Sequence, residues 1–187
     1  MFRQIKLGFG PGLVVATLFA WGCDRPATPA GPKPSFSDGT ASCAAGARFT
    51  GGGRIDPPVA EKTTFGFNLD ASDFCASGGG AAIKGQLQTM NHPTKTLIHS
   101  LTIDDFFSFD DPEGRGGRCA AFSGTARVKD GNGSWMQEQF GAFACDNGEP
   151  GSSAGRGPDR YGISLNDGHE TRETGVTDLT GGNIQAH

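Results

Sequence analysis

Residues 119–151 constrain the fold of this chain more than any other segment, because they predict a long β-hairpin. Two stretches of strand-forming sequence flank a turn at residues 129–134. Within the turn, Gly131, Asn132 and Gly133 suit the positive φ values that tight hairpin turns require. A hairpin centred on Asn132 therefore determines which residues of the two arms face each other.

The two cysteines of this segment are equidistant from Asn132, so the hairpin register places them opposite each other. Directly opposed residues of an antiparallel pair have Cβ atoms close enough for a disulfide. We therefore predict a bridge between Cys119 and Cys145. The same register predicts two further opposed pairs, which are Phe122 with Ala142 and Val128 with Met136.

The composition predicts an all-β domain, an antiparallel sandwich or small barrel of about eight to ten short strands. The chain has 31 Gly and 11 Pro among 187 residues, which indicates many turns, and it lacks the Gly-X-Y period of collagen. Its 14 Phe residues suit the buried faces of strands. Besides the hairpin, we expect strands at residues 47–55, 62–69, 81–90, 94–103, 161–165 and 181–187.

Period-two alternation predicts which side chains of these strands share an inward face. Three such sets occur: Phe65, Phe67 and Leu69; Leu97, His99, Leu101 and Ile103; and Tyr161, Ile163 and Leu165. We expect loops at residues 70–80, which carry Cys75, and at 104–113, and a loop or short edge strand at 168–179. Three glycines at 51–53 indicate a bulge or a close backbone approach. A phosphate-binding loop is the weaker interpretation there, because no helix follows.

Residues 1–22 have the parts of a secretory signal peptide. Arg3 and Lys6 form the charged region, and residues 13–21 form an apolar run that is short for a membrane span. The sequence Ala-Trp-Gly-Cys that ends at Cys23 resembles the lipobox of bacterial lipoproteins, whose cysteine carries acyl chains such as palmitate. We therefore expect lipid attachment at this cysteine; the alternative is a free thiol inside an uncleaved signal.

The cysteine count supports this assignment, because five cysteines leave one without a disulfide partner. Setting Cys23 aside leaves four, which allow three connectivities. The hairpin register favours Cys119 with Cys145, and elimination then pairs Cys43 with Cys75.

The predicted organisation is a signal peptide at 1–22, a lipidated cysteine and tether at 23–45, and a β-rich domain at 46–187. The tether alternates four prolines with small residues, which favours extended chain. The formal net charge is −4, and loss of Arg3 and Lys6 with the signal leaves 14 basic against 20 acidic residues. A mildly acidic chain of this kind argues against a nucleic-acid partner.

Two acidic segments are candidates for chemistry. Residues 104–113 hold five carboxylates around three phenylalanines. A solvated loop is the favoured interpretation, a calcium site comes second and a glycosidase carboxylate pair comes last. The turn after the hairpin offers weak candidate ligands for calcium, namely Asp146, Asn147, Glu149 and Asp159. His99 is interpreted as a core or edge residue, because no two histidines have a metal-ligand spacing.

Seven short motifs occur in an order that is typical of one known family. They are GGGRI at 51–55, FGFN at 65–68, GQLQ at 85–88, HS at 99–100, FSGT at 122–125, DNGEPG at 146–151 and GGNIQAH at 181–187. Over residues 46–187 the chain resembles the post-choice-of-anchor-P domain, a β-rich module of bacterial cell-surface and secreted proteins. The resemblance implies a β fold and an envelope or extracellular location, and it carries no catalytic motif.

Together these features predict a non-catalytic lipoprotein of the bacterial cell envelope, with a structural or ligand-binding role. Its partners would be the membrane, through the lipid, and an unknown envelope or extracellular ligand. We expect no enzyme, because the sequence shows no nucleophile–base pair, and no cofactor apart from possible calcium. The alternatives are a calcium-stabilised adhesion module and a secreted hydrolase that uses carboxylates; without lipidation the protein would be secreted.

Overall fold

The structure, a computed structural model, describes residues 43–148, 157–168 and 171–187. Cys23, most of the tether and Glu149 lie outside the described residues, so the lipid anchor and the domain boundaries stay predictions. The described part is all-β, as predicted, with eleven strands in one antiparallel sheet and a single five-residue helix.

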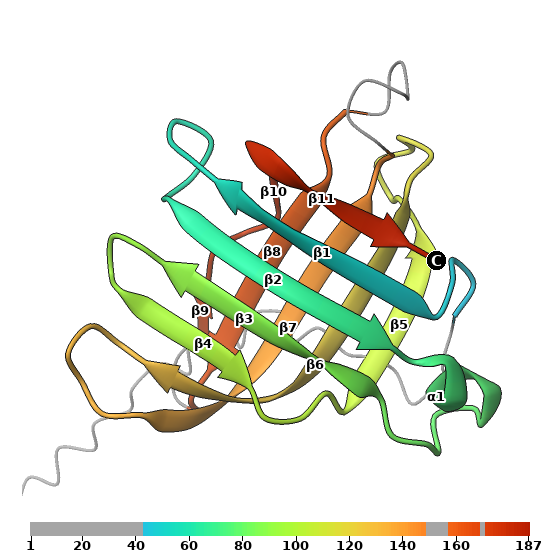
Figure 1. Ribbon diagram of the computed structural model, residues 1–187, viewed down its shortest axis with the longest axis horizontal. Coiled ribbons are helices and arrows are strands. Elements are labelled where there is room, and N and C mark those ends of the chain that lie inside the picture. Colours follow the sequence, from blue (N-terminus) through green and yellow to red (C-terminus); the bar gives the residue numbers. More distant parts are fainter. Residues whose placement is uncertain (1–42, 149–156, 169–170) are drawn as a thin grey trace, which may run out of the picture. The chain divides into compact units, whose positions relative to one another are not determined.

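The elements in chain order are β1 (Arg48–Ile55), β2 (Thr63–Asp70), α1 (Ser72–Ala76), β3 (Lys84–Asn91), β4 (Thr96–Ser100), β5 (Asp105–Asp110), β6 (Arg118–Lys129), β7 (Met136–Asp146), β8 (Arg160–Asn166), β9 (Thr171–Glu173), β10 (Thr177–Asp178) and β11 (Gly181–Ala186). The strands are hydrogen-bonded in the order β10-β8-β7-β6-β4-β3-β2-β1-β11. β5 also pairs with β6, and β9 with β8. The sheet curls on itself, so that β1 to β4 lie across β6 to β8 in a half-barrel (Figure 1).

The β6–β7 hairpin has the register predicted from the sequence. Cys119 lies opposite Cys145, Phe122 opposite Ala142, and Val128 opposite Met136. The structure contains both expected disulfides, Cys119–Cys145 and Cys43–Cys75. In the turn, Gly131 alone of the three predicted residues takes a positive φ, at 53°.

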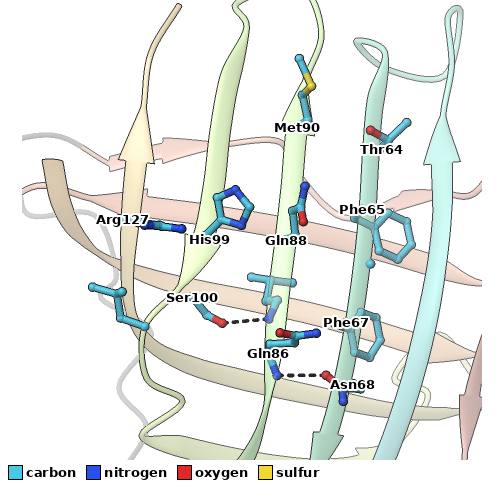
Figure 2. Close-up of a pocket in the computed structure, with 13 residues that line it drawn as sticks. Thr64, Phe65, Phe67, Asn68, Gln86, Gln88, Met90, His99, Ser100 and Arg127 are labelled. Carbon is cyan, nitrogen blue, oxygen red and sulfur yellow. Dashed lines mark hydrogen bonds between the residues drawn. The ribbon is translucent and has the colours of Figure 1, made fainter. Parts of the chain in front are cut away.

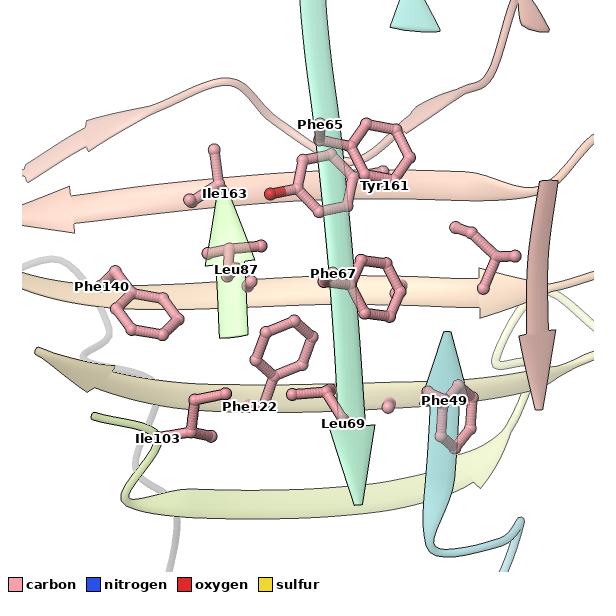
Figure 3. Close-up of a cluster of buried hydrophobic side chains, with 14 of the residues drawn as sticks. Phe49, Phe65, Phe67, Leu69, Leu87, Ile103, Phe122, Phe140, Tyr161 and Ile163 are labelled. Atoms are coloured by element: carbon pink, nitrogen blue, oxygen red, sulfur yellow. The ribbon is translucent and has the colours of Figure 1, made fainter. Parts of the chain in front are cut away.

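An aromatic core joins the two layers of the curled sheet. Phe65 of β2 stacks on Tyr161 of β8 with ring centroids 3.9 Å apart, and Phe67 packs against Phe122 of β6 at 5.6 Å. Figure 3 shows these rings between strands that run in crossing directions. Thr89 of β3 and the hydroxyl of Tyr161 share a 2.6 Å hydrogen bond, so the buried phenol is also satisfied.

Two of the predicted inward faces are correct, and one is wrong. Phe65, Phe67 and Leu69 are buried, as are Tyr161, Ile163 and Leu165. The predicted face of Leu97, His99, Leu101 and Ile103 is not a single face, because β4 ends at Ser100 and the chain changes direction. Ile98 points into the core instead, and Leu101 is 53% exposed.

Two predicted loops contain regular structure. Residues 105–110 form β5 rather than a solvated loop, because Phe106 and Ser108 alternate inward and Ser108 donates a hydrogen bond to the carbonyl of Gly46. Residues 72–76 form α1, which carries Cys75 to its disulfide partner Cys43.

The glycines of β1 reflect a close approach and not a bulge, since β1 pairs with β2 without interruption. A Cβ on Gly51 would lie 2.8 Å from the Ile184 side chain and 3.0 Å from the Phe67 ring. A Cβ on Gly53 would lie 2.6 Å from the carbonyl oxygen of Gly181. Gly52 faces the other way, where a Cβ would make only ordinary contact at 3.5 Å with the Phe65 carbonyl.

These neighbours allow a matched test of the packing. Gly51→Ala should lower the free energy of unfolding by about 1–3 kcal/mol, because the core must move to admit a methyl group. Gly52→Ala should change it by less than about 0.5 kcal/mol. Urea denaturation of the two variants measures both values, and equal stabilities would contradict the inward orientation of Gly51.

Candidate ligand-binding groove

A groove of about 620 Å³ lies on the outer face of β2, β3, β4 and β6. Its floor is the sheet itself, because the inward side chains of these strands belong to the core and the outward ones form the groove. Figure 2 shows Arg127, His99, Gln88 and Thr64 on neighbouring strands of this face. The curl of the sheet therefore leaves a broad polar surface on the side opposite the aromatic core.

The centre of the groove is a row of residues that runs across the strands. Arg127 of β6 lies opposite His99 of β4, and His99 lies opposite Gln88 of β3. Gln88 in turn lies opposite Gly66 of β2. Cross-strand neighbours on one face stand about 4.5–5.5 Å apart, so the row is a continuous strip of polar groups that ends at a glycine.

Gly66 makes the groove hollow at the end of this row. Its φ lies outside the left-handed region, and an added Cβ would meet no atom within 4 Å. The alternation of the Phe-Gly-Phe-Asn sequence explains this arrangement, because Phe65 and Phe67 take the inward positions. The outward positions are left to Gly66 and Asn68.

Three side-chain amides line the groove, that of Gln88 within this row and those of Asn68 and Gln86 beside it. The Asn68 side-chain oxygen accepts a 3.1 Å hydrogen bond from the Gln86 backbone N–H. The amides of Gln86 and Gln88 are exposed and form no hydrogen bond with other residues of the described part of the chain. Each of these two amides can both donate and accept, so they are available to a bound ligand.

Trp135 stands at the Arg127 end of the groove and is 44% exposed. The Arg127 guanidinium lies 5.0 Å from the indole centroid, and the His99 ring lies 5.7 Å from it. A cation within about 6 Å of an indole face is attracted by it. These contacts hold Trp135 beside the polar row with part of its surface open to solvent.

The environment of His99 favours its neutral form. Partial burial lowers the pKa of this histidine below its usual value, and the positive charge of Arg127 lowers it further. At neutral pH the ring therefore has one nitrogen that donates and one that accepts. Together with the two glutamines, the row offers donors and acceptors and a single full charge, that of Arg127.

The predicted calcium ligands lie elsewhere, around the start of β8. Asp159 accepts hydrogen bonds from the backbone N–H groups of Asn147 and Ile184, at 2.8 and 2.6 Å. Asp146 accepts from the backbone N–H groups of Gly148 and Ala186, at 2.8 and 2.9 Å. The two carboxylates thus tie β11 to the ends of β7 and β8.

Two further observations bear on the calcium prediction. The Asn147 side-chain oxygen is buried and has no hydrogen-bond partner among the described residues. It packs tightly on Gly117, where an added Cβ would lie 2.2 Å from this oxygen. Glu149 lies outside the described residues, so calcium binding by the full set stays a prediction.

Two of the five carboxylates of residues 104–113, those of Asp111 and Glu113, form ion pairs with arginine. Arg160 forms ion pairs with buried Asp111 and with Glu113, and it lies over the Phe143 ring. Asp111 also lies near the sulfurs of Cys119 and Cys145. These sulfurs are bonded to each other, so they offer no thiolate to a metal ion.

Comparisons with known proteins give no relative: no protein-family model, no curated protein and no solved structure matches the chain. The resemblance to the post-choice-of-anchor-P domain therefore remains a prediction. The helix found in residues 43–148, 157–168 and 171–187 is too short to cross a membrane.

Sequence reasoning singled out His99 but missed the rest of the groove. It placed the histidine on an apolar face as a core or edge residue, whereas the structure places it on the outer polar face between Arg127 and Gln88. The outward polar positions of β3, Gln86 and Gln88, were the available signal. The position of Arg127 beside His99 could not be inferred, because the pairing of β4 with β6 is not local in sequence.

The surroundings of His99 in the groove predict a lowered pKa for this side chain. Its titration midpoint, followed by NMR of the imidazole Cε1 proton, should lie below 6.5, and Arg127→Gln should raise it. Because the folded state binds fewer protons than the unfolded chain, the linked stability is present above pH 6.5 and is lost as pH falls through the folded-state pKa. His99→Gln should remove that part of the pH dependence. A midpoint at or above 6.5 would contradict the described burial.

Proposed function

We propose that this protein is a non-catalytic lipoprotein of the bacterial cell envelope whose β domain binds a hydroxyl-rich glycan in the outer groove. The observation that carries the proposal is the row from Arg127 through His99 and Gln88 to Gly66, with Trp135 at one end. Signal, lipobox and tether features of the sequence support the envelope location.

The chemistry of the groove suits sugar hydroxyls. Hydroxyl groups both donate and accept hydrogen bonds, and the side chains of Gln86, Gln88 and neutral His99 do the same. An exposed tryptophan offers an amphipathic ring that can pack against the apolar face of a sugar. The charge of Arg127 favours a ligand that is neutral or carries some negative charge, and this distinguishes it from a cationic partner.

A binding role is favoured over catalysis by the partners of four carboxylates from the two acidic segments that were candidates for chemistry. Asp111 and Glu113 pair with Arg160, and Asp146 and Asp159 accept backbone N–H groups. None of the groove-lining residues is a carboxylate. Glycoside hydrolysis normally needs two carboxyl groups that flank the bond to be cleaved, so the hydrolase alternative has weaker support.

The calcium-stabilised alternative is supported by the unpartnered Asn147 oxygen alone. The described carboxylates of that set already have backbone hydrogen-bond partners that hold β11 in place. Their positions are therefore explained without an ion. A nucleic-acid partner is disfavoured by the net charge of −4 and by a groove with one cationic side chain.

The groove proposal predicts that Gly66→Phe weakens glycan binding without loss of stability. The new ring would fill open space on the outer face, so binding of a β-1,4-linked N-acetylglucosamine tetrasaccharide should weaken at least about tenfold while the urea midpoint is retained. In a Trp21→Phe background Trp135 is the sole tryptophan, and its fluorescence reports binding.

A matched control is Gly80→Phe, because Gly80 is exposed, like Gly66 has no positive φ, and would make only ordinary contacts. This variant should bind like the parent protein. Binding that survives Gly66→Phe would exclude the groove. Failure of the tetrasaccharide and of a wider panel of neutral and acidic envelope glycans to bind by calorimetry would exclude the glycan.

The lipoprotein proposal predicts that Cys23→Ser releases the protein from the membrane fraction of a bacterial host. Several acyl chains on one residue bind a bilayer firmly, since each buried methylene contributes roughly 0.8 kcal/mol. Fractionation and mass spectrometry of the N-terminal peptide measure the outcome, with Thr28→Ser in the tether as control. A Cys23→Ser protein that remains in the membrane fraction would contradict the proposed anchor.

A further inference from the structure

We propose that the open end of the half-barrel is a second binding site, which takes a small organic cation with an apolar body. The site is distinct from the outer groove. It is a cavity of about 360 Å³ on the inner side of the sheet, between β3 and β4 of one layer and β8 and β9 of the other. The mouths of β-barrels are common places for small-molecule sites.

The floor of this cavity is apolar. Ile98 of β4 and Ile163 and Leu165 of β8 line it, and each is between 3% and 5% exposed. Figure 3 shows Ile163 on β8 next to Tyr161, at the margin of the aromatic cluster. The core therefore continues into the cavity floor, and an apolar group placed there would lose contact with water.

The rim of the cavity carries excess negative charge. The lining includes the carboxylates of Glu61, Asp130 and Glu173 and a single cation, the guanidinium of Arg172. Asp130 accepts hydrogen bonds from Thr96 at 2.7 Å and from Arg172 at 2.7 Å. Although burial alone would raise the pKa of Asp130, these two bonds hold it below its usual value, so the group remains ionised at neutral pH.

Arg172 does not neutralise the carboxylates of this rim, because its single positive charge is shared between Asp130 and Glu138. Its guanidinium donates to both carboxylate oxygens of Glu138 at 2.6 Å, and the Glu138 side chain is 2% exposed. Hydrogen bonding to Glu138, with a further bond to Asp130, raises the pKa of Arg172. Asp130, Glu138 and Arg172 therefore form a cluster of two carboxylates and one guanidinium, which has a net negative charge.

Two more carboxylates at the rim have no cationic partner within the described ranges. Glu61 accepts a 2.9 Å hydrogen bond from the neutral Asn91 amide, and Glu173 is exposed. Neither forms an ion pair with a described residue. An apolar floor beneath uncompensated carboxylates selects a cation with a hydrocarbon body, and it disfavours fatty acids and other anions.

The test uses the full-length chain and two probes with the same six-carbon alkyl chain and opposite charge, n-hexylammonium and heptanoate. Calorimetry should show binding of n-hexylammonium and at least about tenfold weaker binding of heptanoate. Replacing n-hexylammonium by n-propylammonium should weaken binding by roughly fourfold for each methylene removed, as expected for burial in an apolar floor. Equal binding of both probes would overturn the proposal.

Variants at the rim locate the site. The double variant Glu61→Gln and Glu173→Gln removes two exposed charges and should weaken n-hexylammonium binding at least about fivefold. Asp110→Asn, which removes an exposed carboxylate on β5, is the control and should bind like the parent. Gly66→Phe in the outer groove should also leave this binding unchanged. Unaltered binding by the Glu61/Glu173 variant, or a loss with Gly66→Phe, would overturn the assignment.

A plug variant provides an independent check that does not depend on charge. Thr94 is exposed at the rim, so Thr94→Trp places a large ring over the cavity without entering the core. It should abolish n-hexylammonium binding while the urea midpoint stays within the range of the other surface variants. A folded Thr94→Trp protein that still binds the probe would place the cation elsewhere.

Discussion

The register of the β6–β7 hairpin is the constraint on which the rest of the structure depends. β6 is the longest strand, and it pairs with β7 on one side and with both β4 and β5 on the other. A shift of one residue would turn every side chain of β6 to the opposite face. The Cys119–Cys145 bridge joins a directly opposed pair and so opposes such a shift. By this register Phe122 reaches the core and Arg127 reaches the outer groove.

The strength of the local sequence pattern decided how much of the fold could be predicted. Clean alternation identified the inward residues of β2 and β8, and the symmetry about Asn132 identified the hairpin register and its disulfide. The alternation failed in β4, because the strand stops at Ser100 and no Gly or Pro marks that end. It failed again at β5, where flanking carboxylates resembled a loop although Phe106 and Ser108 alternate inward.

Neither candidate site could be predicted as a whole, because each depends on pairings between distant segments. The groove needs β4 beside β6, and the cavity needs β3 and β4 across from β8 and β9. These relationships follow from how the sheet curls, and local periodicity carries no information about curl. Single residues such as His99 were visible in the sequence, but their neighbours were not. Similarly, Asp146 and Asp159 had the composition of metal ligands, yet in the structure they accept backbone N–H groups.

The pleat of β3 and β4 affects how the two binding surfaces can evolve. Gln88 and His99 face the groove, whereas Thr89 and Ile98, which are their immediate neighbours in the same strands, face the cavity. Substitutions at one set of alternate positions need not disturb the other set, because the two sets of side chains lie on opposite faces of the sheet. Two ligand specificities on one strand pair would therefore be genetically separable, and each could diverge while the other was retained.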